Sequence, residues 1–157
     1  MIKDMRHDVI EAVLSHTQDD DLQRLTRKIE ALQNFMTSND ATALMTAYGR
    51  AANILAKSDA NAKSKVSTEL LEQSEEKALY EAINSTSNAV ETHLAAEAYG
   101  EALASFAQLR QPVDAFFDKV TVNADDAKLR SNRLSLLSAL VDNMQNIADF
   151  SQIQQAA

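Results

Sequence analysis

The chain has 157 residues, with no cysteine, two glycines and one proline, and its formal net charge is -8. Without cysteine it can form neither disulfides nor thiolate metal sites, and two glycines cannot build the glycine-rich phosphate loops of nucleotide-binding proteins. Residues 66–127 hold twelve Asp/Glu against three Lys/Arg, which disfavours a protein that coats a nucleic-acid duplex and leaves room only for a local basic patch.

Apolar residues recur every three or four positions through most of the chain, which predicts amphipathic helices. Residues 4–16 and about 20–36 form the first two, and a third runs from the break at residues 38–40 to about residue 57. The polar residues of the breaks can cap a helix. A long helical region follows over residues 67–109. We expect a kink in it either at the weak helix formers 84–88 or at Gly100.

The last third of the chain continues the helical pattern. Pro112 either ends the long region or lies in the first turn of a new helix. Residues 123–126, Asn-Ala-Asp-Asp, are typical of a capping box with Asp in place of Glu, and the final helix runs from there to about Phe150. Because β-branched and aromatic residues are sparse, the predicted fold is all-α, a single helical bundle over residues 1–157.

Side chains that could carry catalysis or bind a metal are scattered. The three histidines belong to no paired Glu-x-x-His motif, and no serine lies in a nucleophile elbow. The acidic pairs at 75–76 and 125–126 fit the first turns of helices, where the helix dipole favours negative charge. We therefore expect no catalytic residue and no metal ligand in this chain.

Two cations and an amide fall on one face of the third predicted helix. Arg50, Asn53 and Lys57 are spaced three and four residues apart, so they share a face that can contact a phosphate or a base edge. A solvated helix face is the alternative, and the residues by themselves favour neither.

The final helix carries Arg130 and Arg133 within the arc of its apolar stripe. An unpaired buried charge is very costly. We therefore expect Arg133 to form a structural ion pair with Asp118 or Asp114 of the preceding segment. Arg130, nearer the rim of the stripe, is expected to be available to a ligand.

A specific pattern covers the C-terminal part of the chain. Gln111-Pro-Val-Asp-Ala-Phe-Phe-Asp and Asp126-Ala-Lys-Leu-Arg-Ser-Asn-Arg-Leu resemble the DALR-type anticodon-binding domain at the C-terminus of bacterial glycyl-tRNA synthetase beta subunits. The upstream segments 48–55 and 6–14 resemble the same region, with Gly49 where the family tends to carry lysine. The resemblance covers nearly the whole chain and is most specific over residues 111–151.

The resemblance implies a helical bundle that contacts the anticodon stem-loop of glycine tRNA. The expected RNA contacts are Arg50, Asn53, Lys57, Arg130 and Asn132, and all but Lys57 stand at motif positions of the family. The resemblance also implies a non-catalytic fragment of a longer beta subunit. Its partners would be the rest of that subunit and an alpha subunit, in an alpha2-beta2 enzyme that attaches glycine to tRNA. ATP and Mg²⁺ would act at the alpha subunit, so no cofactor is expected here.

Two other functions stay open. A structural or protein-interaction bundle would use the acidic stretch 69–101 as a docking surface, and a small helical enzyme would need carboxylates of strongly raised pKa in a pocket. No apolar run approaches the ~20 residues of a membrane span, and the first residues lack the apolar stretch of a signal peptide. We therefore expect no membrane partner and a cytoplasmic location.

Overall fold

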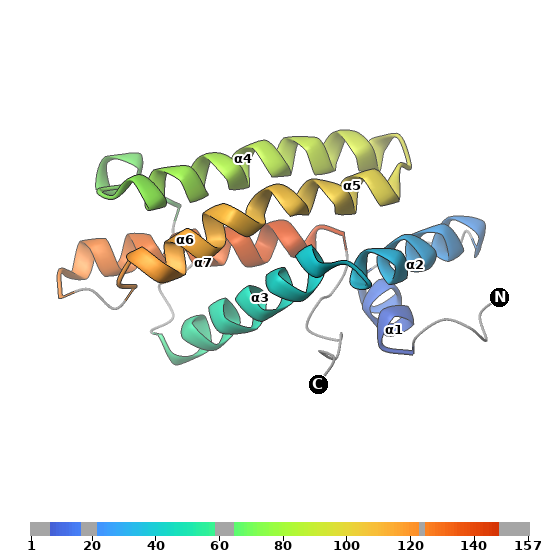
Figure 1. The fold of residues 1–157 in the computed structure, drawn as a ribbon, viewed down its shortest axis with the longest axis horizontal. Coiled ribbons are helices and arrows are strands. Elements are labelled where there is room, and N and C mark those ends of the chain that lie inside the picture. Colours follow the sequence, from blue (N-terminus) through green and yellow to red (C-terminus); the bar gives the residue numbers. More distant parts are fainter. Residues whose placement is uncertain (1–6, 17–21, 59–64, 123–124, 148–157) are drawn as a thin grey trace.

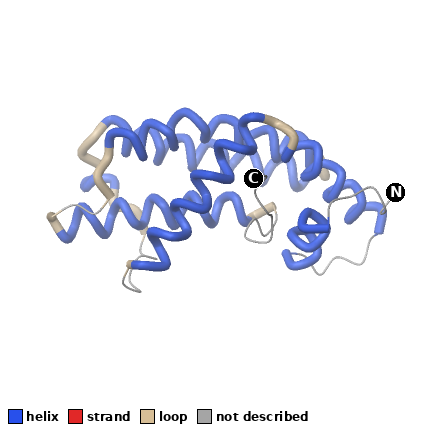
Figure 2. Tube along the Cα trace, turned by 60° about the horizontal axis from the view of Figure 1, so that its bottom comes forward, coloured by secondary structure: helices blue, strands red, loops and turns tan. Residues whose placement is uncertain are grey.

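The computed structural model describes residues 7–16, 22–58, 65–122 and 125–147. Within these residues every regular element is a helix, and helices account for nearly all of the described backbone (Figure 2). The predicted all-α fold is therefore confirmed. The elements in chain order are α1 (His7–His16), α2 (Leu22–Met36), α3 (Asn39–Lys57), η3 (Thr68–Leu70), α4 (Ser74–Ala95), α5 (Tyr99–Ser105), η4 (Phe106–Leu109), α6 (Arg110–Lys119) and α7 (Ala127–Gln145).

The longer helices lie side by side along the long axis of the molecule (Figure 1). α4 packs against α5, α6 and α7, and α3 packs against α6 and α7 from the other side. α2 packs on α5 at one end of the bundle, and α1 packs on α2. Large apolar side chains, among them Phe106, Phe116 and Leu136, are fully buried between these helices. Each contributes roughly 1.5–3 kcal/mol through removal of apolar surface from water.

The break in the long helical region does not fall at residues 84–88, where weak helix formers predicted a kink. α4 continues through them because Ile83, Thr86 and Val90 are buried against neighbouring helices, and packing overrides intrinsic propensity. The second predicted position, Gly100, is also wrong, because this glycine lies inside α5.

The chain turns instead at residues 96–98. Glu97 adopts a left-handed conformation with φ of 57°. The Ala98 backbone N–H donates to the His93 carbonyl at 2.8 Å, and the Glu97 N–H donates to the Leu94 carbonyl at 3.0 Å. These two bonds form a Schellman motif, in which the left-handed position is usually glycine. A glutamate therefore occupies a position that costs it backbone strain.

Pro112 lies in the first turn of α6. This confirms the second of the two predictions for Pro112, that it begins a new helix. At the first residue of this helix, Arg110 Nη1 donates to Asp40 Oδ1 of α3 at 2.9 Å. This bond to a carboxylate raises the pKa of the Arg110 guanidinium and ties the start of α6 to the start of α3.

α7 begins three residues later than the predicted capping box requires. Asp126 is the N-cap, and its Oδ1 accepts from the Lys128 N–H at 2.8 Å and from the Leu129 N–H at 3.3 Å. Asn123, the predicted cap, and Phe150, the predicted helix end, lie outside the described residues.

Replacing Asp126 with alanine should lower the free energy of unfolding by about 1 kcal/mol, because two N–H groups of α7 lose their acceptor. Urea denaturation followed by circular dichroism would measure the change. Asp125→Ala removes the same charge from the neighbouring residue, which does not cap α7, and should cost much less. Equal losses from the two variants would contradict the capping role.

Candidate functional site

One exposed face of α3 gathers the predicted polar and cationic side chains. Arg50, Asn53 and Lys57 are exposed, and together with Thr46, Gly49 and Ile54 they line a shallow depression of about 610 Å³. We call these six residues the α3 face. The expectation that the three polar residues share one face is confirmed, because spacings of three and four residues place side chains on neighbouring turns.

The position of Arg50 is set by an aromatic ring from another helix. Its Cζ lies 4.4 Å from the centroid of the Phe117 ring in α6, which is cation–π distance. Phe117 packs edge-to-face on the fully buried Phe116, with ring centroids 5.7 Å apart. The guanidinium therefore rests on a half-buried ring that is itself held by the core.

Phe117 was not among the residues predicted from the sequence. The adjacent pair Phe116-Phe117 was the available signal, because consecutive residues on a helix point about 100° apart. When one of the pair enters the core, the other faces a different neighbour, and here that neighbour is Arg50 of α3.

Arg133 is buried and paired, but the predicted partners Asp114 and Asp118 are wrong. Its Nε donates to Glu76 Oε1 of α4 at 2.9 Å, and its Nη1 donates to the Thr121 carbonyl at 2.8 Å. Asp118 is exposed, with its carboxylate 3.6 Å from the Lys119 ammonium, and Asp114 is also exposed. α7 packs along α4, so Arg133 meets the first turn of that helix.

Glu76 is the second half of this buried pair. The residue is fully buried, and its Oε2 accepts the backbone N–H groups of Glu72 at 3.0 Å and Gln73 at 2.8 Å. One carboxylate therefore caps α4 and neutralises an arginine of α7. The pair connects the start of α4, the middle of α7 and the segment after α6, and this role is structural.

Asn132, predicted to contact RNA, is only 4% exposed. Its Oδ1 accepts from the Ser67 N–H at 2.7 Å, and its Nδ2 donates to the Ser67 carbonyl at 3.0 Å. The prediction is corrected, because both polar atoms of the amide are used to fix the backbone before η3.

Asn132→Ala should therefore lower the free energy of unfolding by about 1–3 kcal/mol, since the Ser67 backbone groups lose both hydrogen bonds. RNA affinity of the folded variant should stay within about twofold of the parent chain. Thermal unfolding and a fluorescence-anisotropy titration would measure the two effects. If the variant is as stable as the parent chain but has lost RNA affinity, Asn132 does contact RNA and the correction is wrong.

The first turns of α7 add further positive charge. Lys128 is exposed and lines a second depression together with Lys65, and Arg130 is half-exposed on the same turn. Figure 1 shows the C-terminal end of α3 and the N-terminal end of α7 at the same end of the molecule, away from α1. This end therefore combines the α3 face with the cations of α7.

Residues 44–154 match the DALR anticodon binding domain family. The match spans well over half of the chain, and the chain belongs to this family of anticodon-binding domains. It is also similar over nearly its whole length to proteins named glycine-tRNA ligase beta subunit. The identity is 46% to that of Rhodospirillum centenum over 97% of the chain, 38% to that of Cereibacter sphaeroides over 96%, and 41% to that of Aliivibrio fischeri over 94%.

The resemblance found in the sequence is thus confirmed by both comparisons. The chain spans about a fifth of the length of these relatives, 22% for the first two and 21% for the third. The match to the family begins within α3 and includes the whole α3 face, α6 and α7. α1 and α2 precede it.

The described part of the chain contains neither a metal-binding cluster nor a membrane-spanning helix. No three His, Asp or Glu side chains among the described residues come together as a metal site requires. None of the helices in this part of the chain is both long and apolar enough to cross a lipid bilayer.

Proposed function

We propose that the chain binds the anticodon region of glycine tRNA through the α3 face and the first turns of α7. The observation that carries the proposal is Arg50, which is exposed, is held on the Phe117 ring, and lies inside the stretch that matches the anticodon-binding family. Similarity to glycine-tRNA ligase beta subunits supports the choice of tRNA.

The three polar side chains of the α3 face suit the chemistry of a single-stranded loop. Unstacked loop bases are recognised by stacking on planar groups and by hydrogen bonds to their edges. Arg50 offers a planar cation, Asn53 offers both a donor and an acceptor, and Lys57 offers a point charge for phosphate. Phosphate contacts position the RNA, and base contacts give specificity.

The acidity of the chain does not oppose this role, because the charge is unevenly distributed. The exposed carboxylates Glu72, Glu81 and Glu91 belong to α4 or its approach, and α4 lies across the bundle from α3 (Figure 1). A local basic face with acidic surface elsewhere repels RNA from the wrong side and directs it to the basic side.

We further infer that the chain is the anticodon-binding part of a longer beta subunit of an alpha2-beta2 glycine-tRNA ligase. In that assembly this domain is non-catalytic, and ATP and Mg²⁺ act at the alpha subunit. Its partners are the rest of the beta subunit and the alpha subunit, in the cytoplasm. Similarity to relatives of that name over nearly the whole chain supports this inference.

An NMR titration tests the RNA contact, because it detects weak binding and locates it. The isotope-labelled chain receives a glycine-tRNA anticodon stem-loop at low salt, and a stem-loop with scrambled loop bases serves as control. We expect loop-dependent shifts at Arg50, Asn53 and Lys57 and on the first turns of α7. Identical shifts with the scrambled loop, or none at millimolar RNA, would reject anticodon recognition.

A protein-docking bundle is the alternative, favoured by the exposed carboxylates of α4. It predicts no response to RNA and chemical shift changes on α4 when the alpha subunit is added. The same labelled sample therefore separates the two functions.

A further inference from the structure

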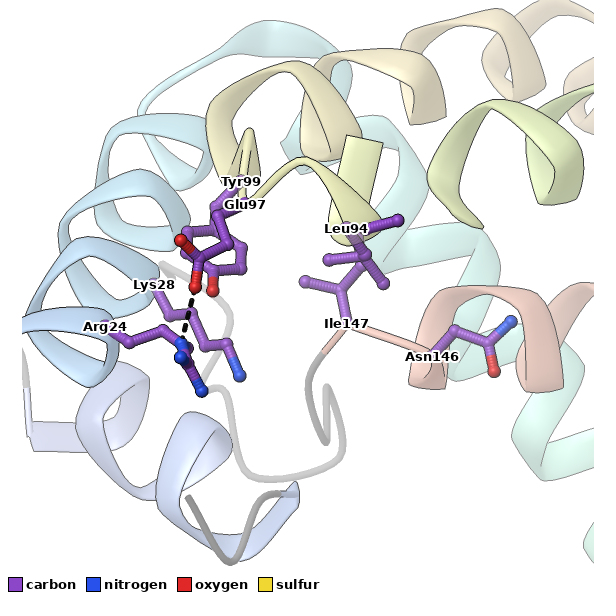
Figure 3. A pocket seen from close by; sticks show the side chains of 8 residues that line it. Arg24, Lys28, Leu94, Glu97, Tyr99, Asn146 and Ile147 are labelled. Atoms are coloured by element: carbon purple, nitrogen blue, oxygen red, sulfur yellow. Dashed lines mark hydrogen bonds and ion pairs between the residues drawn. The ribbon is translucent and has the colours of Figure 1, made fainter. Parts of the chain in front are cut away.

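A third basic pocket, separate from the α3 face and from the depression lined by Lys65 and Lys128, lies between α2 and the turn that joins α4 to α5. Figure 3 shows Arg24 and Lys28 of α2 beside Glu97 and Tyr99, with Leu94 and Ile147 across the pocket from them. Asn146, directly after α7, is also a lining residue. The volume is about 400 Å³. Asn146 lies 18 residues after Lys128, so about 27 Å of helix separates this pocket from the basic end of α7.

Two cations of α2 lie over the ring of one tyrosine, and a third pairs with the neighbouring Glu97. The Lys28 ammonium lies 5.4 Å, and the Arg27 Cζ 5.9 Å, from the centroid of the Tyr99 ring. The Arg24 Nε donates to Glu97 Oε1 at 2.6 Å. Tyr99 is 5% exposed, so the ring is a fixed wall against which the cations are held.

Glu97 is the only carboxylate among the described residues that line this pocket, against two cations. Its Oε2 also lies 3.5 Å from Arg27 Nη2. The residue sits at the left-handed position of the Schellman turn, where glycine costs no strain. The glutamate at this strained position places a carboxylate of the protein itself among the α2 cations. A bound anionic ligand would need the same position.

We propose that this pocket binds a phosphate group and that Glu97 is its internal competitor. An arginine fork beside a lysine suits the oxygens of phosphate, and Leu94 and Ile147 line the same pocket with apolar surface. The exposed bonds of Glu97 to the arginines are weak enough for an anion of higher charge to displace them. The phosphate belongs either to an RNA backbone or to a small phosphate compound.

The test uses two probes on the labelled full chain at low salt: inorganic phosphate, and a loop-free RNA duplex. Saturable shifts of the Arg24 side-chain Nε–H and of the Lys28 and Tyr99 amides are expected with at least one probe. A response to the duplex assigns the phosphate to RNA. A response to inorganic phosphate alone assigns the pocket to small phosphate compounds. No saturable shift with either probe overturns the proposal.

Three glutamine variants test the competitor. Glu97→Gln should tighten binding of the responding probe about threefold to fivefold, because the carboxylate no longer has to be displaced, and Lys28→Gln should weaken it by at least as much. Glu101→Gln makes the same charge change on the exposed side of α5, where its carboxylate faces His93 at 3.4 Å, and should change affinity less than twofold. Equal tightening by Glu97→Gln and Glu101→Gln would indicate only a long-range charge effect and would refute the role of Glu97 as a competitor.

The pocket stands independently of anticodon binding, because the readouts are separate. Shifts on the α3 face that depend on the loop bases report the proposed function, whereas shifts at Arg24 and Lys28 with loop-free probes report this pocket. Either result can fail without the other.

Discussion

Arg133→Met should lower the free energy of unfolding by about 3–5 kcal/mol, the largest loss we expect from any single polar substitution. The change leaves the fully buried Glu76 carboxylate without its cation. It also removes the donor to the Thr121 carbonyl. Urea denaturation followed at 222 nm would measure the loss.

A second variant separates the unpaired charge from lost packing. In Arg133→Met combined with Glu76→Gln, the buried site carries no charge, and the amide oxygen of the new glutamine side chain can still accept a backbone N–H at the start of α4. Because the main penalty is an uncompensated buried charge, the double variant should recover at least half of the stability. No recovery would show that packing and hydrogen bonds, rather than charge, dominate at this position.

Lys119→Met is the matched control for this experiment. It removes the same charge from an exposed cation of α6 whose neighbour Asp118 is also exposed. The control should change stability by less than about 0.5 kcal/mol. A loss comparable to that of Arg133→Met would indicate that net charge, and not the buried pair, sets the effect.

Arg50→Gln should weaken binding of the anticodon stem-loop about tenfold, which corresponds to about 1.4 kcal/mol. A base stacked on an aromatic side chain contributes about 1–3 kcal/mol, and arginine adds cation–π contact with bases. We expect the lower part of this range for Arg50, because the substitution removes both the planar cation and its charge. Fluorescence anisotropy with a labelled stem-loop at fixed salt would measure the affinity. The fold should be unaffected, because Arg50 is exposed.

The scrambled loop distinguishes the kind of contact that Arg50 makes. If the guanidinium contacts a base, the loss is larger for the native loop than for the scrambled loop; if it contacts only phosphate, both lose equally. Lys119→Gln, on the same helix as Phe117, is the control for the loss of a positive charge. Equal weakening by Arg50→Gln and Lys119→Gln would contradict a specific role of the α3 face.

The helices and the grouping of Arg50, Asn53 and Lys57 could be predicted from the sequence because both are local properties. A helix repeats every 3.6 residues, so apolar spacing indicates which segments are helical and which polar residues share a face. The structure confirms the all-α fold and the shared face of Arg50, Asn53 and Lys57. The motifs in residues 111–151 were likewise sufficient to indicate the family.

Contacts between residues far apart in the chain depend on how the helices pack, and the sequence did not predict them. Arg133 pairs with Glu76, 57 residues away, and Asn132 bonds Ser67, 65 residues away, because α7 lies against α4 and η3. The sequence could show that a buried arginine needs a carboxylate, but the packing of helices determines which one it meets. The same packing carries α4 straight through residues 84–88 and places Phe117 beneath Arg50.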